Sequence, residues 1–264
     1  MDIGSRLHAV RTSKGLSQRE LAKRVGVTNS TISLIEQNKV SPSVGSLKKV
    51  LDGIPISLAD FFTLDLAGDA SDGPYYAAEE QPDVGNNDIH YFLVGSRRGN
   101  RQMCILREVM PPGSDTGDTS LSHDGEEGGV IIQGQVEITV GDRVKVLGPG
   151  EAYYFESRTP HRFRNVGNND IHYFLVGSRR GNRQMCILRE VMPPGSDTGV
   201  TMLSHDGEEG GVVVQGRVEV TVGDHVRVLG PGEAYYFESR VPHRFRNIGD
   251  EEAVLVSANT PPTF

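Results

Sequence analysis

The chain of 264 residues carries 27 Lys and Arg against 35 Asp and Glu, a formal net charge of −8. Its length allows one to three domains with buried cores, its two cysteines exclude a disulfide framework, and no apolar run is long enough to span a membrane. The charge is uneven, because residues 1–65 carry nine Lys and Arg against six Asp and Glu. We therefore expect a cytoplasmic protein whose basic head meets an anion and whose acidic body does not.

The N-terminal part of the chain has the apolar spacing of helices. Ser17 and Glu20 are spaced as a capping box at the start of SQRELAKRV, and Gly26 is expected to end that helix. By the same logic, Ser43 and Ser57 are expected to begin two further short helices. Two short helices joined by a tight turn, inside a bundle of about five, are typical of a helix-turn-helix domain.

The run GLSQRELAKRVGVTNSTISLIEQNKVSPSVGSLKKVL resembles the DNA-binding domain of the lambda-repressor-like (Xre) family. The resemblance implies that TNSTISLIEQN is the recognition helix, which enters the major groove of a double-stranded DNA operator. It implies base contacts by Asn29, Ser30 and Ser33. The phosphate contacts that it implies are made by Gln18, Thr28, Asn38 and Lys39.

Arg11 and Glu36 are expected to pair with each other and to hold the first helix against the third. The alternative interpretation of this whole segment is a helical bundle used only for protein contacts. The completeness of the motif favours DNA binding.

Most of the remaining chain is one block repeated. After an expected linker over residues 66–85, with a short strand near Tyr75 and Tyr76, the segment Asn86–Gly167 recurs with ten differences as Asn168–Gly249. The first 32 positions of the two blocks are identical, which indicates a recent duplication, a recombination product or an engineered chain. Whatever chemistry one block carries is therefore present twice, whereas the N-terminal 85 residues have no second copy.

Each block contains short alternating runs separated by Gly and Pro, among them HYFLV, QMCILREVM and EAYYFES. Many short strands at this spacing are typical of a β-sandwich or barrel. Cys104 and Cys186 occupy the same position of the two blocks inside apolar runs, so we expect buried thiols.

Two motifs in each block carry chemistry. The spacings H-x3-E-x6-G, from His123 to Gly134, and P-H-x3-N, from Pro160 to Asn165, resemble the two signature motifs of the cupin family. The resemblance implies that the motifs face the interior of a barrel, where two His and one carboxylate suffice for Fe, Ni or Zn. The candidate ligands are His123, Glu127 and His161 in the first block, and His205, Glu209 and His243 in the second. Leu121 and Leu203 stand where cupins usually have a further His.

These resemblances together predict an α + β multidomain chain. We expect a five-helix helix-turn-helix domain over residues 1–65, followed by two tandem cupin (double-stranded β-helix) barrels over residues 86–167 and 168–264.

The alternative to a metal site is a metal-free pocket in which the same side chains hold a small organic cation. In that case Tyr154 and Tyr236 are candidates to stack on the cation, with core filling as the competing role of these rings. Further acids face either the pocket or solvent, and alternation alone does not decide which. They are Glu108, Glu126, Glu190 and Glu208.

The order of head, linker and cupin, with the runs SHDGEEGGVVVQGRVEV, PHRFRNIG and VSANTPPTF, resembles the putrescine-responsive repressor family. The resemblance covers the chain except for the extra block. It implies a repressor of polyamine-utilisation genes that releases DNA when a polyamine such as putrescine binds the cupin, with no catalytic residue and no required cofactor. Two competing hypotheses are a metal-dependent non-heme oxygenase or epoxidase with a helix-turn-helix head, and a binding module without a DNA role.

The duplication gives one segment two roles. The second block is followed by an apolar run, AVLVSA, that can close its barrel, whereas the first block continues directly into Asn168–Ser178, the opening of the second. We expect Ile171–Val176 to join one barrel and to leave the other with an exposed edge.

The duplication also bears on the oligomeric state of the chain. Repressors of this kind bind two-fold operators as homodimers. Two cupins in one chain form an alternative, intramolecular pair, which would leave a monomer with a single head.

Overall fold

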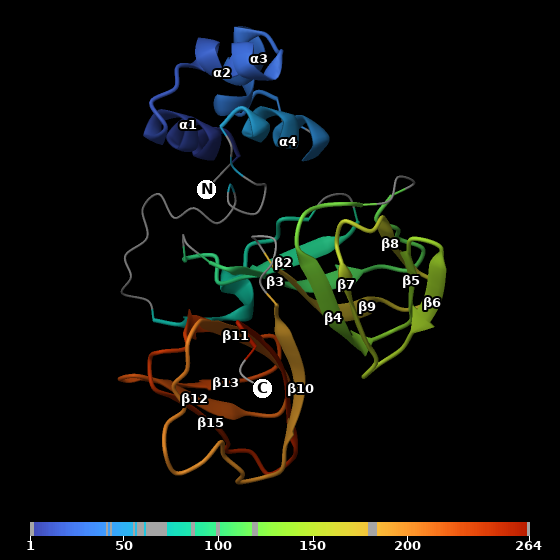
Figure 1. Ribbon diagram of the computed structural model, residues 1–264, viewed down its shortest axis with the longest axis vertical. Coiled ribbons are helices and arrows are strands. Elements are labelled where there is room, and N and C mark those ends of the chain that lie inside the picture. The colour runs from blue at the N-terminus through green and yellow to red at the C-terminus, as the bar shows by residue number, and fades with distance from the viewer. Residues whose placement is uncertain are drawn as a thin grey trace. The chain divides into compact units, whose positions relative to one another are not determined.

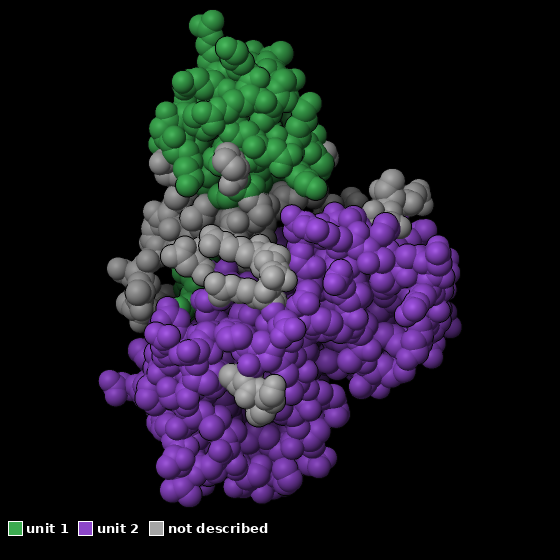
Figure 2. All heavy atoms as spheres, in the orientation of Figure 1, with its two compact units in different colours: residues 1–69, 96–99 green, residues 70–95, 100–264 purple. Residues whose placement is uncertain are grey.

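The structure is a computed structural model that describes residues 3–40, 42, 44–54, 56, 61, 73–85, 88–98, 101–117, 121–178 and 184–262. The chain divides into two compact units, residues 1–69 with 96–99 and residues 70–95 with 100–264 (Figure 2). The described α-helices lie in the first unit, and the strands, with the short 3-10 helix η2 (Ala78–Glu80), lie in the second (Figure 1). Among the described residues, no helix is long and apolar enough to cross a membrane.

The described helices of the first unit are α1 (Ile3–Ser13), α2 (Gln18–Val25), α3 (Asn29–Glu36) and α4 (Val44–Asp52). The predicted capping box is confirmed, since the Ser17 hydroxyl accepts from the backbone N–H of Glu20 and the Glu20 carboxylate accepts from that of Ser17. Gly26 ends α2 at φ 65°, a left-handed conformation that glycine adopts without strain. The helix expected to begin at Ser43 is present as α4, which starts at Val44, whereas residues 57–60, where the other helix start was expected, lie outside the described residues.

The first unit has a core of its own. Leu7 of α1, Leu21 of α2, Ile32 of α3 and Leu47 of α4 are almost completely buried in one apolar cluster. The helical spacing of the apolar residues therefore places one face of each helix in this core, as the sequence pattern predicts.

The strands of the second unit form two barrels, each built from a five-stranded and a three-stranded antiparallel sheet. In the first barrel the strands are β2 (His90–Val94), β3 (Met103–Met110), β4 (Glu126–Gln133), β5 (Val136–Val140), β6 (Arg143–Leu147), β7 (Ala152–Glu156), β8 (His161–Asn165) and β9 (Ile171–Ser178). In the second they are β1 (Tyr75–Tyr76), β10 (Cys186–Met192), β11 (Glu208–Gln215), β12 (Val218–Val222), β13 (His225–Leu229), β14 (Ala234–Glu238), β15 (His243–Asn247) and β16 (Ala253–Thr260). The sheet orders are β2-β3-β9-β4-β7 with β6-β5-β8, and β1-β14-β11-β16-β10 with β13-β12-β15.

The segment Ile171–Val176, which either barrel could have contained, lies in β9 of the first barrel. The prediction that only one barrel contains this segment is therefore confirmed. β9 pairs with β3 and β4, as β16 pairs with β10 and β11. The expected boundary after residue 167 is therefore wrong, because without β9 the strands β3 and β4 would have no strand between them. In the second barrel β10 pairs with β16 alone among the described strands, so its other edge is open.

The last part of the expected linker belongs to the second barrel. The strand expected near Tyr75 and Tyr76 is present as β1, and it pairs with β14. The Tyr75 hydroxyl donates to the backbone oxygen of Val220 at 2.7 Å, and the Gln81 side chain donates to that of Gly232 at 2.7 Å. The stretch 66–85 is therefore not a free linker throughout, although residues 62–72 lie outside the described part.

The two barrels meet across an apolar contact that we call the inter-barrel seam. Ile105 packs on Gly210, and its counterpart in the second block, Ile187, packs on Gly128; a Cβ on either glycine would lie 2.7 Å from the isoleucine. Because each contact is matched by its equivalent with the blocks exchanged, the seam has the self-complementary pattern of a two-fold dimer. The intramolecular cupin pair considered from the sequence is thus present in the fold.

Both cysteines are free and half-buried, so the expectation of buried thiols is met only in part. Burial nevertheless raises the pKa of the Cys104 thiol to about 11.

Candidate functional site: a recognition helix and two imidazole–carboxylate clusters

The N-terminal end of α3 presents short polar side chains. Thr28 caps this helix by accepting a backbone hydrogen bond at 3.1 Å, and Asn29 and Ser30 follow it on the surface. Ser33 is half-buried and accepts a hydrogen bond from Gln37 at 2.9 Å. This arrangement suits entry of the helix end into a major groove. The exposed members of the predicted DNA-contacting set are Thr28, Asn29, Ser30, Asn38 and Lys39.

Two residues expected at phosphates have hydrogen bonds inside the head. Gln18 donates to the Glu36 carboxylate at 2.7 Å. The Asn38 side-chain oxygen accepts from the backbone N–H of Gly4 at 2.9 Å, which ties the end of α3 to the start of α1. The structure therefore gives the side chains of Gln18 and Asn38 a packing role that the sequence pattern did not indicate.

The predicted pairing of Arg11 with Glu36 is present. Arg11 donates to both carboxylate oxygens of Glu36, at 2.6 and 2.9 Å, and to the backbone oxygen of Leu16 at 2.6 Å. Burial alone would raise the pKa of Glu36, but hydrogen bonds from Arg11, Gln18 and His8 outweigh it and hold that pKa below its usual value. This ion pair locks α1 against α3.

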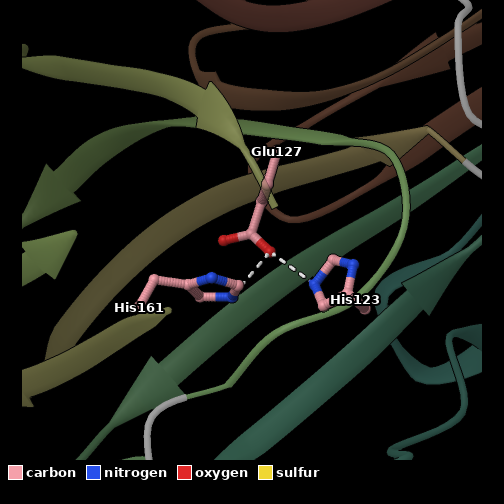
Figure 3. Close-up of side chains that lie close together, drawn as sticks. All are labelled: His123, Glu127 and His161. Atoms are coloured by element: carbon pink, nitrogen blue, oxygen red, sulfur yellow. Dashed lines mark hydrogen bonds and ion pairs between the residues drawn. The ribbon is translucent and has the colours of Figure 1, made fainter. Parts of the chain in front are cut away.

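The three candidate ligands of the first barrel lie together (Figure 3). His123 precedes β4, Glu127 lies within β4 and His161 begins β8. Nε2 of His123 is 3.3 Å from Glu127 Oε2, and Nε2 of His161 is 3.7 Å from the same oxygen. His161 and Glu127 are buried while His123 is exposed, so the cluster reaches solvent on the His123 side.

The second barrel repeats this cluster. Nε2 of His205 and Nε2 of His243 lie 3.3 and 3.6 Å from Glu209 Oε2. The side chain of His205 is less exposed than that of His123, at 22% against 47%. Its hydrogen bond to Glu209 raises the pKa of His205 above the usual value for an imidazole.

The two inner histidines, His161 and His243, have a hydrogen-bond partner at Nδ1 but none at Nε2. Nδ1 of His161 lies 2.9 Å from the backbone oxygen of Thr159, and Nδ1 of His243 lies 2.8 Å from that of Val241. A carbonyl oxygen can only accept a hydrogen bond, so Nδ1 must carry the proton. In the neutral ring, Nε2 then carries a lone pair and can only accept. This lone pair has no hydrogen-bond partner and faces the carboxylate. Two acceptors in this arrangement call for a cation between them: a proton, an ammonium group or a metal ion.

Both clusters have a donor set that fits a divalent metal. In each, one atom from each of the three residues lies within 4.8 Å of the others. The Nδ1 contact to a backbone carbonyl is also the outer hydrogen bond that metal-ligating histidines usually have. Leu121 and Leu203 offer no fourth donor.

The tyrosine pairs are placed the opposite way from the prediction. Tyr153 and Tyr235 point into the barrels, where their rings pack in the interior apolar clusters. Tyr154 and Tyr236 lie at the inter-barrel seam, where their hydroxyls accept from the backbone N–H of Met185 and Met103. They are therefore not placed to bind a ligand inside a barrel, because neighbouring residues of a strand face opposite sides and the outer side here meets the other barrel.

The further acids divide in the same way. Glu126 and Glu208 accept hydrogen bonds from the seam tyrosines at 2.8 and 2.7 Å. Glu108 and Glu190 lie on the inner face of their barrels. Burial raises the pKa of Glu190, and it raises that of Glu108 well above the usual value.

Comparison with known proteins accounts for both units. The cupin domain family matches residues 106–177 and 188–259, and the helix-turn-helix family matches residues 7–61. The transcriptional regulator PuuR of Escherichia coli is 34% identical over 165 residues, which cover 62% of this chain and 87% of PuuR. The chain belongs to the PuuR-like family of helix-turn-helix regulators with cupin domains. Since 62% of the chain covers 87% of PuuR, a regulator of that length has no room for a second block.

A second regulator and two solved structures are also similar to this chain. The regulator SutR of Escherichia coli is 25% identical over 173 residues, covering 65% of this chain and 91% of SutR. Among solved structures, AerE of Microcystis aeruginosa has a TM-score of 0.58 at 15% identity, covering 66% of this regulator and 93% of AerE. Oxalate decarboxylase of Lactobacillus farciminis has a TM-score of 0.60 at 12% identity, covering 75% and 88%. At such low identity these two structures support the fold alone.

Sequence reasoning missed several residues near the clusters. Ser257 and Asn259 of β16 lie on the same face as Leu255, which is in the interior core of the second barrel. The alternation in AVLVSANT was the available signal. In the head, exposed Gln37 was missed although it stands four residues after Ser33, on the same helix face.

Proposed function

We propose that this regulator is a sequence-specific DNA-binding repressor whose cupin domain senses a small organic cation, of the class of polyamines such as putrescine. The observation that carries the sensing part is the pair of inner histidines whose Nε2 lone pairs face a buried carboxylate. The candidate ligand-binding residues in the two barrels are His123, Glu127, His161, His205, Glu209 and His243.

An ammonium group suits this environment for two reasons. It carries N–H donors for the carboxylate and for the imidazole lone pair at once. It also brings the positive charge that a buried carboxylate requires for its own burial to be favourable. Each cluster also has an aromatic wall, because the ring of Phe155 lies 4.9 Å from that of His161 and the ring of Phe237 lies 4.9 Å from that of His243.

The DNA-reading half of the proposal predicts that Asn29→Ala weakens operator binding by about 1–3 kcal/mol, since Asn can pair with adenine through two hydrogen bonds. The loss should be confined to one base position. Lys39→Ala is the matched control, because a phosphate contact weakens all sequences alike and reduces the salt dependence of binding. Fluorescence anisotropy with an operator and with single-base variants measures both. Equal losses on all sequences for Asn29→Ala would contradict base reading by this residue.

The sensing half predicts that putrescine raises the thermal stability of the chain. Binding to the folded state alone at 100 times Kd adds about 2.7 kcal/mol. The double variant Glu127→Gln with Glu209→Gln removes the charge from both clusters at nearly constant shape, and it should abolish this stabilisation. Agmatine and spermidine, with neutral 1,4-butanediol as control, establish whether charge is required. Stabilisation by butanediol as strong as by putrescine would refute recognition of a cation.

Binding relieves repression only to the extent that the amine prefers one state of the protein over the other. We propose that the amine-bound state is the one that no longer holds DNA. Operator affinity measured with and without putrescine gives this preference directly.

The second candidate function is a metal-dependent oxygenase, which the three-donor geometry of each cluster favours. Fe(II) held by His123, Glu127 and His161, or by their counterparts, would supply open coordination positions for oxygen chemistry. Stoichiometric iron in purified protein together with oxygen consumption on a substrate would replace the sensor proposal. The regulator names of PuuR and SutR support the sensor.

A further inference from the structure

The two barrels have almost the same sequence but different inner walls. The difference comes from the strand that closes each one. β9 lines the first barrel with Tyr173, Leu175 and Gly177, whereas β16 lines the second with Leu255, Ser257 and Asn259 at the equivalent positions. This follows from the duplication, because β9 is the opening of the second block used as the closing strand of the first.

In the first barrel, the carboxyl group of Glu108 is enclosed by neighbouring side chains. Glu108 of β3 stands opposite Tyr91 of β2 on one side and Tyr173 of β9 on the other, and these two tyrosines are the same residue of the two blocks. Tyr173 is buried, and the nearby Glu108 raises its pKa further beyond the effect of burial. Its ring stacks on that of Phe163 at a centroid distance of 5.8 Å. Glu108 is only 2% exposed, so the rings and the neighbouring strands leave it no access to a ligand.

In the second barrel the equivalent carboxyl group is open. Glu190 of β10 stands opposite Leu255 of β16, and among the described strands none lies on its other side. It is partly exposed, and the Ser257 hydroxyl donates a hydrogen bond to it. Among the described strands, none places a tyrosine opposite Glu190, so its carboxylate oxygens can accept from a ligand.

The same interior holds a fully buried nitrogen without a hydrogen-bond partner, Nε2 of His243. The Glu209 carboxylate lies close enough to Glu190 to raise the pKa of Glu190 beyond the effect of burial. The second barrel therefore offers one carboxylate with an imidazole lone pair and a second carboxylate with a hydroxyl, on one inner face.

We propose that the second barrel alone is the amine site, with Glu209 and His243 holding one ammonium group and Glu190 with Ser257 holding the other. The ligand is accordingly a short diamine, bound once per chain, and the first barrel serves as a structural partner. This inference rests on the proposed amine-sensing function and assigns it to one of two nearly identical blocks.

The test is isothermal titration of the full chain with putrescine, using variants at equivalent positions of the two blocks. The expected stoichiometry is one per chain. Glu190→Gln should weaken binding about 10- to 100-fold, because a charge-assisted hydrogen bond is lost. The matched variant Glu108→Gln should leave Kd within about twofold, since that side chain is sealed. The mono-amine butylamine should bind the parent chain more weakly than putrescine and should be insensitive to Glu190→Gln.

A second variant keeps the test independent of charge. Leu255→Tyr copies the wall of the first barrel into the second, and it should abolish binding while far-ultraviolet circular dichroism stays unchanged. Two sites per chain, or equal losses from Glu108→Gln and Glu190→Gln, would overturn the assignment to the second barrel and leave the sensor function standing. No binding of any amine by the parent chain would overturn both.

Discussion

Replacing Glu36 with alanine is expected to lower the free energy of unfolding of the head by about 3–5 kcal/mol. The side chains of Arg11 and Glu36 are only 7% and 3% exposed, so removal of the carboxylate leaves a buried guanidinium without its counter-charge. It also removes the acceptor of Gln18. Since small domains have about 5–15 kcal/mol in total, most of the head's stability would be lost. Thermal melts followed at 222 nm report mainly on the described α-helices, which lie in the head.

Two further variants test the cause. Arg11→Met combined with Glu36→Leu replaces both charges by apolar groups and should recover most of the stability, as buried pairs often allow. Asp124→Ala breaks the pair with Arg158, whose side chains are both about three-quarters exposed, and should cost less than about 1 kcal/mol. A single variant Glu36→Ala that melts within 1 kcal/mol of the parent would refute this account of the ion pair.

The same carboxylate sets a pH dependence. The pKa of Glu36 is lowered in the folded head, so its contribution to stability is present above its usual value of 4.5 and is lost as the pH falls through the folded pKa. The parent head should therefore lose stability on acidification below about pH 4.5, and the double variant with Met and Leu should lose less.

Local chemistry was predictable from the sequence because each motif acts over a few residues. Ser17 with Glu20 and Gly26 need only their neighbours to form a helix start and a helix end. His123, Glu127 and His161 meet because the two motifs lie on strands whose order the fold family implies. The allocation of Ile171–Val176 to one barrel followed from the fact that a strand fills only one interior.

The burial and the hydrogen-bond partners of several side chains depend on contacts that are distant in the sequence, and these could not be predicted. Alternation places Tyr153 and Tyr154 on opposite faces but does not say which face is inside, because the outer face also meets a surface, the other barrel. Identical sequence even has different exposure: Tyr154 is 48% exposed whereas Tyr236 is fully buried, because β1 pairs with the edge of β14 and no described strand pairs with the equivalent edge of β7. The packing role of Gln18 was hidden for the same reason, since its partner is eighteen positions away.

Deleting residues 86–167 is expected to convert the chain into a dimer with about 10²–10⁴-fold higher affinity for a two-fold operator. The deletion leaves the local sequence VGNNDIHYF unchanged at the junction, because the same residues precede both blocks. Ile171–Val176 then becomes free to pair with the open edge of β10, as β2 pairs with β3 in the first barrel. The seam surface that holds Ile187 loses its intramolecular partner and must find it in a second chain.

The physical reason for the gain in affinity is the number of heads. We infer that the seam of the tandem chain is satisfied internally, so a chain with one head reads one half-site. Two single-block chains joined through the same self-complementary seam carry two heads, and the second head binds at high effective concentration. Light scattering gives the mass of each species, and anisotropy titrations with one-site and two-site operators give the affinities. On a one-site operator the two proteins should bind alike.

A charged residue in the seam is the matched control. Ile187→Glu in the single-block chain places a carboxylate against Gly210 of the partner chain, where an isoleucine packs in the tandem chain. Burial of that unpaired charge should prevent dimerisation and return the operator affinity to the level of the tandem chain. If the tandem chain itself is a dimer in solution, or if the deletion leaves the two-site affinity unchanged, then the internal seam does not replace the contact between chains, and the duplication has no effect on the number of heads at an operator.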